Sequence, residues 1–146
     1  MAQAGEVVAR VGAGKFGTLI EAPGHGWTMD EPLDVGGLDA GPTPYDALLA
    51  ALGACTSMTL RLFATREAIP LEDVVVRLHH DRNHARDCDH CADPGASPHI
   101  EAIFRTITLV GPLSAEQRAR LMDIADKCPV HRTLTSEVRI VTTEAE

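Results

Sequence analysis

Aromatic and basic residues are both scarce in this chain, and each shortage argues against a class of function. Only 3% of the 146 residues are aromatic, which is too few for the stacking platforms that bind single-stranded nucleic acid. Thirteen basic against 21 acidic side chains give a formal net charge of −8, the wrong sign for holding a phosphate backbone. We therefore expect no nucleic-acid partner and a core built from Ala, Val, Ile and Leu.

Long apolar runs are also absent. The longest uncharged apolar stretch, residues 47–60, is too short to span a bilayer and is typical of a buried core helix. The N-terminal residues show no apolar signal region. We expect a cytoplasmic protein without a membrane partner. In that compartment, the four cysteines point to catalytic, redox or metal chemistry rather than structural bridging.

Motifs for P-loop phosphate binding and for hydrolytic chemistry are missing as well. The sequence contains no Walker loop, no H-E-x-x-H and no G-x-S-x-G. These absences leave the cysteines and their neighbours as the main candidates for chemistry.

Hydrophobic periodicity and turn residues predict a single α+β domain over residues 1–146. Strands are expected at 6–11 and 16–21 as a hairpin, at 72–80, 100–110 and 137–142, with a further short strand near Trp27. Hairpin-length connections outnumber crossovers, which favours mostly antiparallel pairing. The loop before the first helix holds Gly36, Gly37 and Gly41, where the backbone is expected to need positive φ or close approach.

The strongest local signal is a helix over residues 44–67. Thr43 is placed to cap it, Pro44 suits its first position, and Asp46 stands where a capping box has an acid. The body that follows is apolar nearly all round, so it must be covered on most sides. This pattern predicts the core element of the fold.

Cys55 lies in the middle of that helix. A cysteine within an Ala/Leu-rich helix usually serves as a small hydrophobic residue, and a reactive thiol is the other interpretation. The local sequence leaves both open.

A second helix is predicted to begin after Ser114, in the S-x-x-Q capping pattern with Gln117, and to end or kink at Cys128 because proline follows it. Pro129 can open a new helical turn whose unpaired amides would favour a Cys128 thiolate, and His131 adds a protonatable group. A core cysteine that simply ends the helix is the alternative.

A third candidate site is the C-x-x-C formed by Cys88 and Cys91. With His84 and one more histidine, these residues fit a tetrahedral zinc site, and His79, His80, His90 and His99 lie nearby in the sequence. A redox dithiol and an inert loop are the other two interpretations.

Two segments together resemble the OsmC/Ohr family of osmotically inducible and organic hydroperoxide resistance proteins. They are GPTPYDALLAALGACTSMTLRLFA and ADKCPVHRTLTSEVRI, each carrying one cysteine with its own helix. The resemblance covers most of the chain from Gly36 onward, and the HARDCDHC insert matches an OsmC-like subgroup. It implies antiparallel sheets wrapped around a long buried central helix, in an intertwined homodimer with active sites at the interface.

The resemblance also implies thiol peroxidase chemistry without a required cofactor. Cys55 would attack an organic hydroperoxide, Cys128 would resolve the resulting sulfenic acid as a disulfide, and a lipoyl-type dithiol would reduce it again. Apolar walls would favour organic peroxides over hydrogen peroxide; the candidate wall residues are Leu48, Leu52, Met58 and Phe63.

Two features of the family's pattern differ here. Characterised members carry a Glu ten residues before the first cysteine, where this chain has Tyr45. Their activating Arg precedes the long helix, and the candidates in this chain are Arg10 or, alternatively, Lys15. The alternative function is a non-enzymatic OsmC-like protein that binds a metal at the Cys88/Cys91 loop or a small apolar ligand in the helix pocket.

Overall fold

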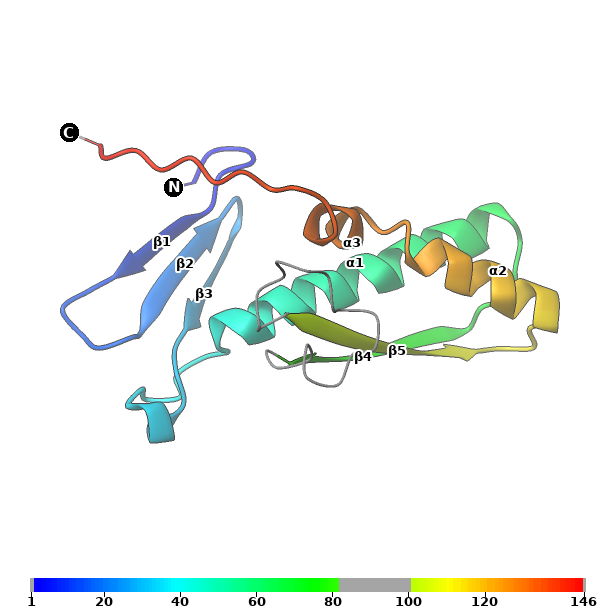
Figure 1. Cartoon of the computed structure of the whole chain (residues 1–146), viewed down its shortest axis with the longest axis horizontal. Helices are drawn as coiled ribbons and strands as arrows, with labels where there is room; N and C mark the ends of the chain where they lie inside the picture. Colours follow the sequence, from blue (N-terminus) through cyan, green and yellow to red (C-terminus); the bar gives the residue numbers. More distant parts are fainter. Residues whose placement is uncertain (1, 82–100, 146) are drawn as a thin grey trace, which may run out of the picture. The chain divides into compact units, whose positions relative to one another are not determined.

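The computed structural model describes residues 2–81 and 101–145 and divides the chain into two compact units, Met1–Leu48 and Leu49–Glu146. Three strands precede the long helix, and two strands and two shorter helices follow it (Figure 1). This composition confirms the predicted α+β class and antiparallel pairing. A single domain over residues 1–146 stays a prediction.

The first unit contains a three-stranded antiparallel sheet in the order β1-β2-β3. Its strands are β1 (Val8–Val11), β2 (Thr18–Ala22) and β3 (His25–Met29). The predicted hairpin of the first two strands is confirmed, as is the short strand around Trp27, which pairs with Ile20 of β2.

Asp30 organises the loop that follows β3, which includes the short 3-10 helix η1 (Leu33–Val35). Its carboxylate is 3% exposed and accepts hydrogen bonds from the backbone N–H groups of Glu31, Leu38 and Ala40, at 2.8, 3.0 and 3.2 Å. The bond from Glu31 has the largest part in lowering the pKa of the Asp30 carboxyl, which burial alone would raise. The buried carboxylate thus satisfies three backbone N–H groups of this loop.

The glycines of this loop meet the two predicted constraints. Gly36 has a φ of +93°, in the left-handed region that glycine tolerates best. A Cβ on Gly37 would lie 1.8 Å from the Glu31 carbonyl oxygen, and one on Gly41 would lie 2.0 Å from that of Thr28. The backbone therefore approaches itself more closely than any side chain would permit.

The long helix α1 (Pro44–Arg66) begins where the sequence predicts. The backbone N–H of Asp46 donates to Thr43 Oγ1 at 3.1 Å, and the Thr43 N–H and hydroxyl both donate to the Asp46 carboxylate, at 3.0 and 2.8 Å. This reciprocal pair satisfies backbone donors that the first turn would otherwise leave open.

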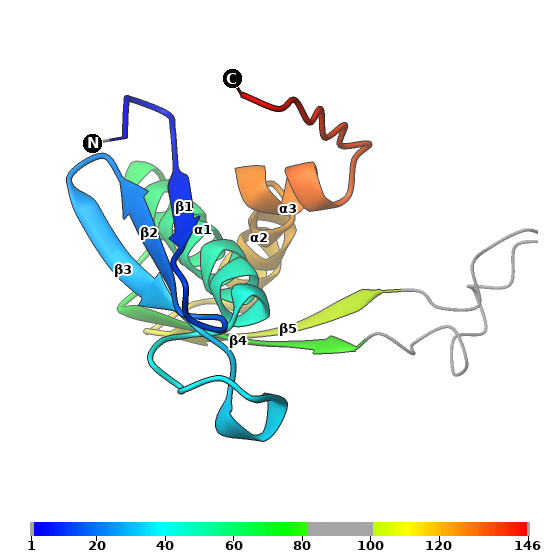
Figure 2. The ribbon, with the colours of Figure 1, turned by 90° about the vertical axis from the view of Figure 1, so that its left-hand side faces the viewer.

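The second unit packs helices on one face of a two-stranded sheet. β4 (Asp73–Asp81) and β5 (Ala102–Val110) pair antiparallel, and α1 and α2 (Ala115–Ala125) lie on the same side of them (Figures 1 and 2). α3 (Pro129–Leu134) follows closely on α2. The buried hydrophobic cluster joins these elements: Leu60, Ala64, Ile69, Leu71, Leu109, Leu121 and Ala125.

The ends of α2 also follow the sequence. Ser114 Oγ accepts from the Gln117 N–H at 3.1 Å, and Gln117 Oε1 accepts from the Ser114 N–H at 2.9 Å, which completes the predicted capping box. The new helical turn predicted after Cys128 is present as α3.

The predicted strand at residues 137–142 is wrong. Residues 137–145 form no helix or strand in the structure, and Ile140 and Val141 are 88% and 86% exposed. β-branched residues favour a strand, but a strand also needs a neighbour for its backbone groups. No described strand pairs with this segment.

One face of α1 is buried and the rest is not. The buried side chains of this helix are Leu52, Thr56, Leu60 and Ala64. On other faces, Met58 and Leu62 are 70% and 62% exposed. By length and composition alone α1 could cross a membrane, a test that the core helices of soluble proteins also pass. Its exposed apolar surface leaves room for a covering partner.

Candidate functional site

The structure brings Cys55 and Cys128 together although they lie on different elements. Cys55 is in the middle of α1 and is partly exposed, whereas Cys128 precedes α3 and is 0% exposed. Both are free thiols, and they lie close enough for each to shift the pKa of the other. This pairing is the central feature of the site.

The pKa values of the two thiols are shifted in opposite directions. Burial raises the pKa of the Cys55 thiol, and the hydrogen bond to Cys128 raises it further. Burial would also raise the pKa of the Cys128 thiol, but hydrogen bonds from Cys55, His131, Thr56 and Val130 outweigh it and lower that pKa. The pKa of Cys55 is therefore shifted upward and that of Cys128 downward.

Backbone amides contribute to this preference. Pro129 sets the first position of α3, so the Cys128 sulfur lies over the opening turn and accepts from the His131 N–H at 3.4 Å. The Val130 backbone lowers the pKa of both thiols. The sequence prediction that unpaired amides would meet Cys128 is thus matched by the geometry.

Thr56 lies next to Cys55 on α1, and its side chain is fully buried. Its hydroxyl donates to the Leu52 carbonyl at 2.8 Å. The Thr56 side chain is also one of the groups that lower the pKa of the Cys128 thiol.

Arg105 is the residue that the sequence analysis missed. It lies on β5 with its side chain 12% exposed, and its Nη1 donates to Thr56 Oγ1 at 3.0 Å and to the Ala125 carbonyl at 3.3 Å. The signal was in the strand pattern. Ile103, Arg105, Ile107 and Leu109 alternate with exposed residues, so a cation occupies a position on the buried face.

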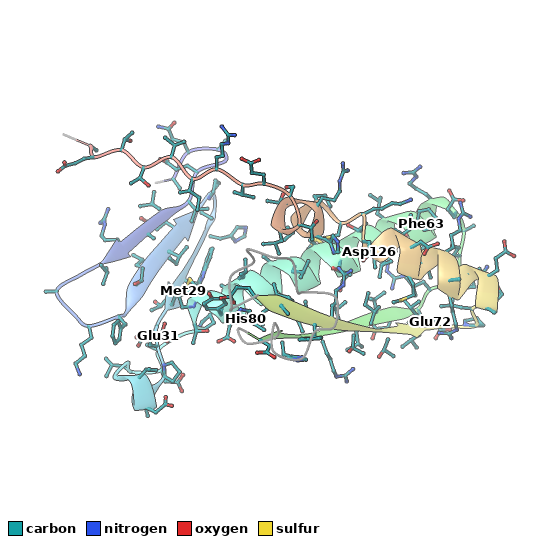
Figure 3. All side chains as sticks on the ribbon, in the orientation of Figure 1. Met29, Glu31, Phe63, Glu72, His80 and Asp126 are labelled. Atoms are coloured by element: carbon teal, nitrogen blue, oxygen red, sulfur yellow. The ribbon has the colours of Figure 1, made fainter. Side chains whose placement is uncertain are left out.

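Arg105 also pairs with Asp126, the residue that follows the last turn of α2 (Figure 3). Arg105 Nη2 lies 2.7 Å from Asp126 Oδ1, and His131 Nδ1 lies 3.8 Å from the same oxygen. The guanidinium is therefore fixed on both sides, between a carboxylate and the Thr56 hydroxyl.

The predicted substrate-wall residues lie at different depths along α1. Leu52 is 4% exposed, Leu48 is 36% exposed, and Met58 is 70% exposed. Phe63 packs against the core cluster, with the Arg120 guanidinium 4.9 Å from its ring centroid (Figure 3). Their role toward a substrate stays a prediction.

The candidate activating residues Arg10 and Lys15 belong to the first unit. Arg10 is an exposed residue of β1, paired with Leu19 of β2, and Lys15 lies between those strands. A catalytic role for either stays a prediction, whereas Arg105 donates a hydrogen bond to Thr56, the residue that follows Cys55 in the second unit.

The predicted zinc ligands His84, Cys88 and Cys91 lie outside the described residues. Within residues 2–81 and 101–145, no group of three His, Cys, Asp or Glu side chains is placed to hold a metal ion. The zinc hypothesis therefore stays a prediction for metal analysis.

The family model for OsmC-like proteins matches residues 36–143 of the chain, a range that holds both cysteines of the pair. The chain belongs to the OsmC-like protein family. This match confirms the family indicated by the two cysteine segments. A comparison with curated protein sequences finds no significant match.

Solved structures of OsmC and Ohr proteins share this fold at low identity. An OsmC-like protein from Mycoplasma pneumoniae is 21% identical with a TM-score of 0.70, covering 88% of this chain and 85% of its own. An organic hydroperoxide resistance protein OsmC from Legionella pneumophila is 17% identical with a TM-score of 0.63, covering 89% and 88%. The organic hydroperoxide resistance protein OhrB of Bacillus subtilis is 16% identical with a TM-score of 0.59, covering 89% of each. Membership of the OsmC/Ohr group supports a redox role related to peroxides at the level of the family.

Proposed function

We propose that this OsmC-like protein is a thiol peroxidase that reduces organic hydroperoxides with Cys55 and Cys128. The single observation that carries the proposal is the proximity of the two thiols, which come from α1 and from the α2–α3 junction and shift each other's pKa. Two neighbouring free cysteines can form a disulfide where their Cα atoms lie within about 7 Å of each other.

The two sulfurs differ in solvent exposure, and this difference assigns the order in which they react. Cys55 is the partly exposed member, so an incoming peroxide meets it first, whereas the fully buried Cys128 is placed to act second. Because the pKa of Cys128 is lowered and that of Cys55 is raised, Cys128 would accept the proton of Cys55 as Cys55 becomes the nucleophile. Cys128 thereby serves first as base and then as resolving thiol.

The chemical steps balance within this pair. The Cys55 thiolate attacks the terminal oxygen of the hydroperoxide, the O–O bond breaks, and the alkoxide that leaves takes up a proton to become the alcohol. Cys128 then attacks the Cys55 sulfenic acid, the S–O bond breaks, and water leaves after protonation. The two electrons that reduce the peroxide come from the two thiols, which end as a disulfide.

A dithiol donor of the lipoyl type would complete the cycle. One donor thiolate attacks the Cys55–Cys128 disulfide, and its second thiol releases the protein by exchange, so the donor becomes the cyclic disulfide. No metal or organic cofactor takes part in these steps. Apolar surface at Leu48 and Met58 would favour an alkyl hydroperoxide over hydrogen peroxide.

We also propose that the protein is a homodimer. Met58 and Leu62 leave apolar surface on α1 that one chain does not cover, and an isologous contact with a second copy would bury it. The exposed apolar residues Ile140 and Val141 of the C-terminal segment add to this uncovered surface.

A steady-state peroxidase assay tests the proposed reaction. The intact protein should consume an organic hydroperoxide in the presence of dihydrolipoamide, and Cys55→Ser should reduce consumption to the background rate. Cys88→Ser is the matched control, because it removes a thiol outside the pair. Consumption by the wild type at the Cys55→Ser background would overturn the reaction and favour a binding protein on the same fold.

A further inference from the structure

One nitrogen of Arg105 connects the two segments that carry Cys55 and Cys128. Arg105 Nη1 donates to Thr56 Oγ1 at 3.0 Å, and Thr56 directly follows Cys55 on α1. The same nitrogen donates at 3.3 Å to the Ala125 carbonyl, which also accepts from the backbone N–H of Cys128 at 3.4 Å. A single donor on β5 is therefore bonded to the residue next to Cys55 and to the carbonyl that holds the Cys128 backbone.

The groups around this nitrogen are buried. Thr56 is 0% exposed, Ala125 is 1% exposed, and the Arg105 side chain is 12% exposed. Hydrogen bonds in such surroundings are stronger than on the surface, because the local dielectric constant is low and water does not compete. The Thr56 hydroxyl also donates to the Leu52 carbonyl at 2.8 Å, which fixes its orientation on α1. The connection is therefore part of the core and not a surface ion pair.

The second nitrogen of the guanidinium binds the same α2–α3 junction. Arg105 Nη2 lies 2.7 Å from Asp126 Oδ1, and Asp126 stands two residues before Cys128. Arginine is planar and presents its donors in a fixed fork, so two partners bound at once define its position and its plane. The segment that leads into Cys128 is thus held to β5 at two consecutive residues, Ala125 and Asp126.

The neighbouring strand contacts α1 on the other side of Cys55. Leu78 of β4 is the register partner of Arg105. It packs against Gly53, where a Cβ would lie 2.9 Å from Leu78 Cδ1. Glycine is a poor helix former, so its presence within α1 is explained by this close approach. The pair Leu78–Arg105 therefore contacts α1 two residues before Cys55 and one residue after it.

We propose that Arg105 is a positioning residue that sets the spacing of Cys55 and Cys128 and so favours the disulfide between them. It acts through the backbone neighbours of the two cysteines, and all of its contacts lie inside the second unit. The inference deepens the proposed function, on which its catalytic meaning rests, because in that reaction the spacing governs the attack of Cys128 on the Cys55 sulfenic acid. The spacing itself can be tested without peroxide.

The test measures the equilibrium constant of the Cys55–Cys128 disulfide against glutathione in the intact protein. The protein S–S bond forms, the S–S bond of one oxidised glutathione breaks, and the two thiol protons end on two reduced glutathiones. Differential alkylation followed by peptide mass spectrometry reports this disulfide alone. Arg105→Met should lower the constant about tenfold, because a small misplacement of two reacting groups lowers their effective concentration. Arg105→Lys, whose single nitrogen can replace Nη1 but not Nη2, should recover part of the loss.

The matched control is Arg118→Met. Arg118 joins α2 to the end of β5, donating to the Leu109 carbonyl at 3.0 Å and to the Gly111 carbonyl at 3.4 Å. Its loss removes one cation and two hydrogen bonds to carbonyls, four residues or more along the chain from Arg105. The glutathione constant should therefore stay within about twofold of the wild type. Urea unfolding of the reduced variants separates a general loss of stability from a change in spacing.

Thr56 variants test the connection to α1 without changing a charge. Thr56→Val removes the hydroxyl and should lower the constant, whereas Thr56→Ser keeps it and should stay within about twofold of the wild type. The double variant Arg105→Met/Thr56→Val should fall no further than Arg105→Met alone, because both changes break the same connection. Equal losses in Arg105→Met and Arg118→Met, or multiplied losses in the double variant, would overturn the proposal.

Two further readouts keep the test decisive. If circular dichroism shows that Arg105→Met does not fold, Arg105→Lys carries the comparison: a constant below that of the wild type supports the proposal, and one equal to the wild type overturns it. The expected pattern in a protein that consumes no organic hydroperoxide would uphold the role of Arg105 and refute the proposed function alone. Peroxide consumption with equal losses in the two arginine variants would do the reverse.

Discussion

Arg105 donates a 3.0 Å hydrogen bond to Thr56, a residue 49 positions earlier in the chain and directly after Cys55. The contact joins β5 to α1 inside the second unit and places a positive charge beside the residue that follows Cys55. Because the guanidinium is also bound to Asp126, its position does not depend on a substrate or a partner. The thiol site is therefore organised before any peroxide arrives.

The first prediction concerns the exposed face of α1. Leu62→Glu places a charge on apolar surface that we expect a second copy to cover, and burial of an unpaired charge is costly, so the dimer should dissociate. Sedimentation velocity should show a dimer for the wild type and a monomer for this variant. Ala119→Glu, which adds the same charge at an exposed position of α2, should remain dimeric. A monomeric wild type at micromolar concentration would contradict the proposed homodimer.

The second prediction concerns the capping box of α2. Ser114→Ala removes the oxygen that accepts from the Gln117 N–H, and loss of such a cap lowers the free energy of unfolding by about 1 kcal/mol. Urea denaturation followed by circular dichroism measures the loss. Ser136→Ala, at an exposed site with a local bond to the Thr133 carbonyl, should change it by less than about 0.5 kcal/mol. Equal losses in the two variants would show that the cap does not stabilise α2.

Much of the fold can be predicted from the sequence because its signals are local. Thr43 and Ser114 set the N-terminal starts of α1 and α2, because their capping hydrogen bonds join residues only three apart. Pro44 suits the first position of α1. The strand at 137–142 fails for the opposite reason, since pairing depends on a distant neighbour that the local pattern does not specify. Helix starts with local capping partners are thus predicted, whereas the lack of a pairing strand for the last segment is not.

The site divides in the same way. Cys55 and Cys128 could be singled out because each has a distinctive local surrounding, in an apolar helix and before a proline. Arg105 lies in an ordinary strand. Its place in the site depends on hydrogen bonds to Thr56 and Asp126, which are distant in sequence and come near it only in the folded chain. A cation on the buried face of a strand was the one sequence signal for it.

The third prediction is a dependence on pH with a definite sign. In the wild type the pair loses its first proton at a pH below the ordinary range of a free thiol, about 8.5, because hydrogen bonds lower the pKa of Cys128 despite its burial. In Cys128→Ser, Cys55 must ionise alone, and burial still raises its pKa. Stopped-flow oxidation of Cys55 by an organic hydroperoxide should therefore rise through a higher pH midpoint in Cys128→Ser than in the wild type. A midpoint equal to or below that of the wild type would contradict Cys128 as the base.

The fourth prediction concerns the C-x-x-C segment. If His84, Cys88 and Cys91 hold zinc, protein purified reduced and without chelator should carry close to one zinc per chain, because tetrahedral sites of this kind bind tightly. Elemental analysis measures the content, and Cys88→Ser should lose the metal while Cys55→Ser keeps it. Metal-free wild-type protein would leave the segment as a redox dithiol or an inert loop.

The most direct test of the account is a single turnover of the reduced protein with one equivalent of organic hydroperoxide, followed by peptide mass spectrometry of the alkylated products. The proposed reaction should release one alcohol for each intramolecular Cys55–Cys128 disulfide, leave a sulfenic or over-oxidised Cys55 in Cys128→Ser, and show no fast phase in Cys55→Ser. Unconsumed peroxide with both thiols still reduced would contradict this reaction. So would a disulfide that forms in the wild type no faster with the peroxide than in air alone.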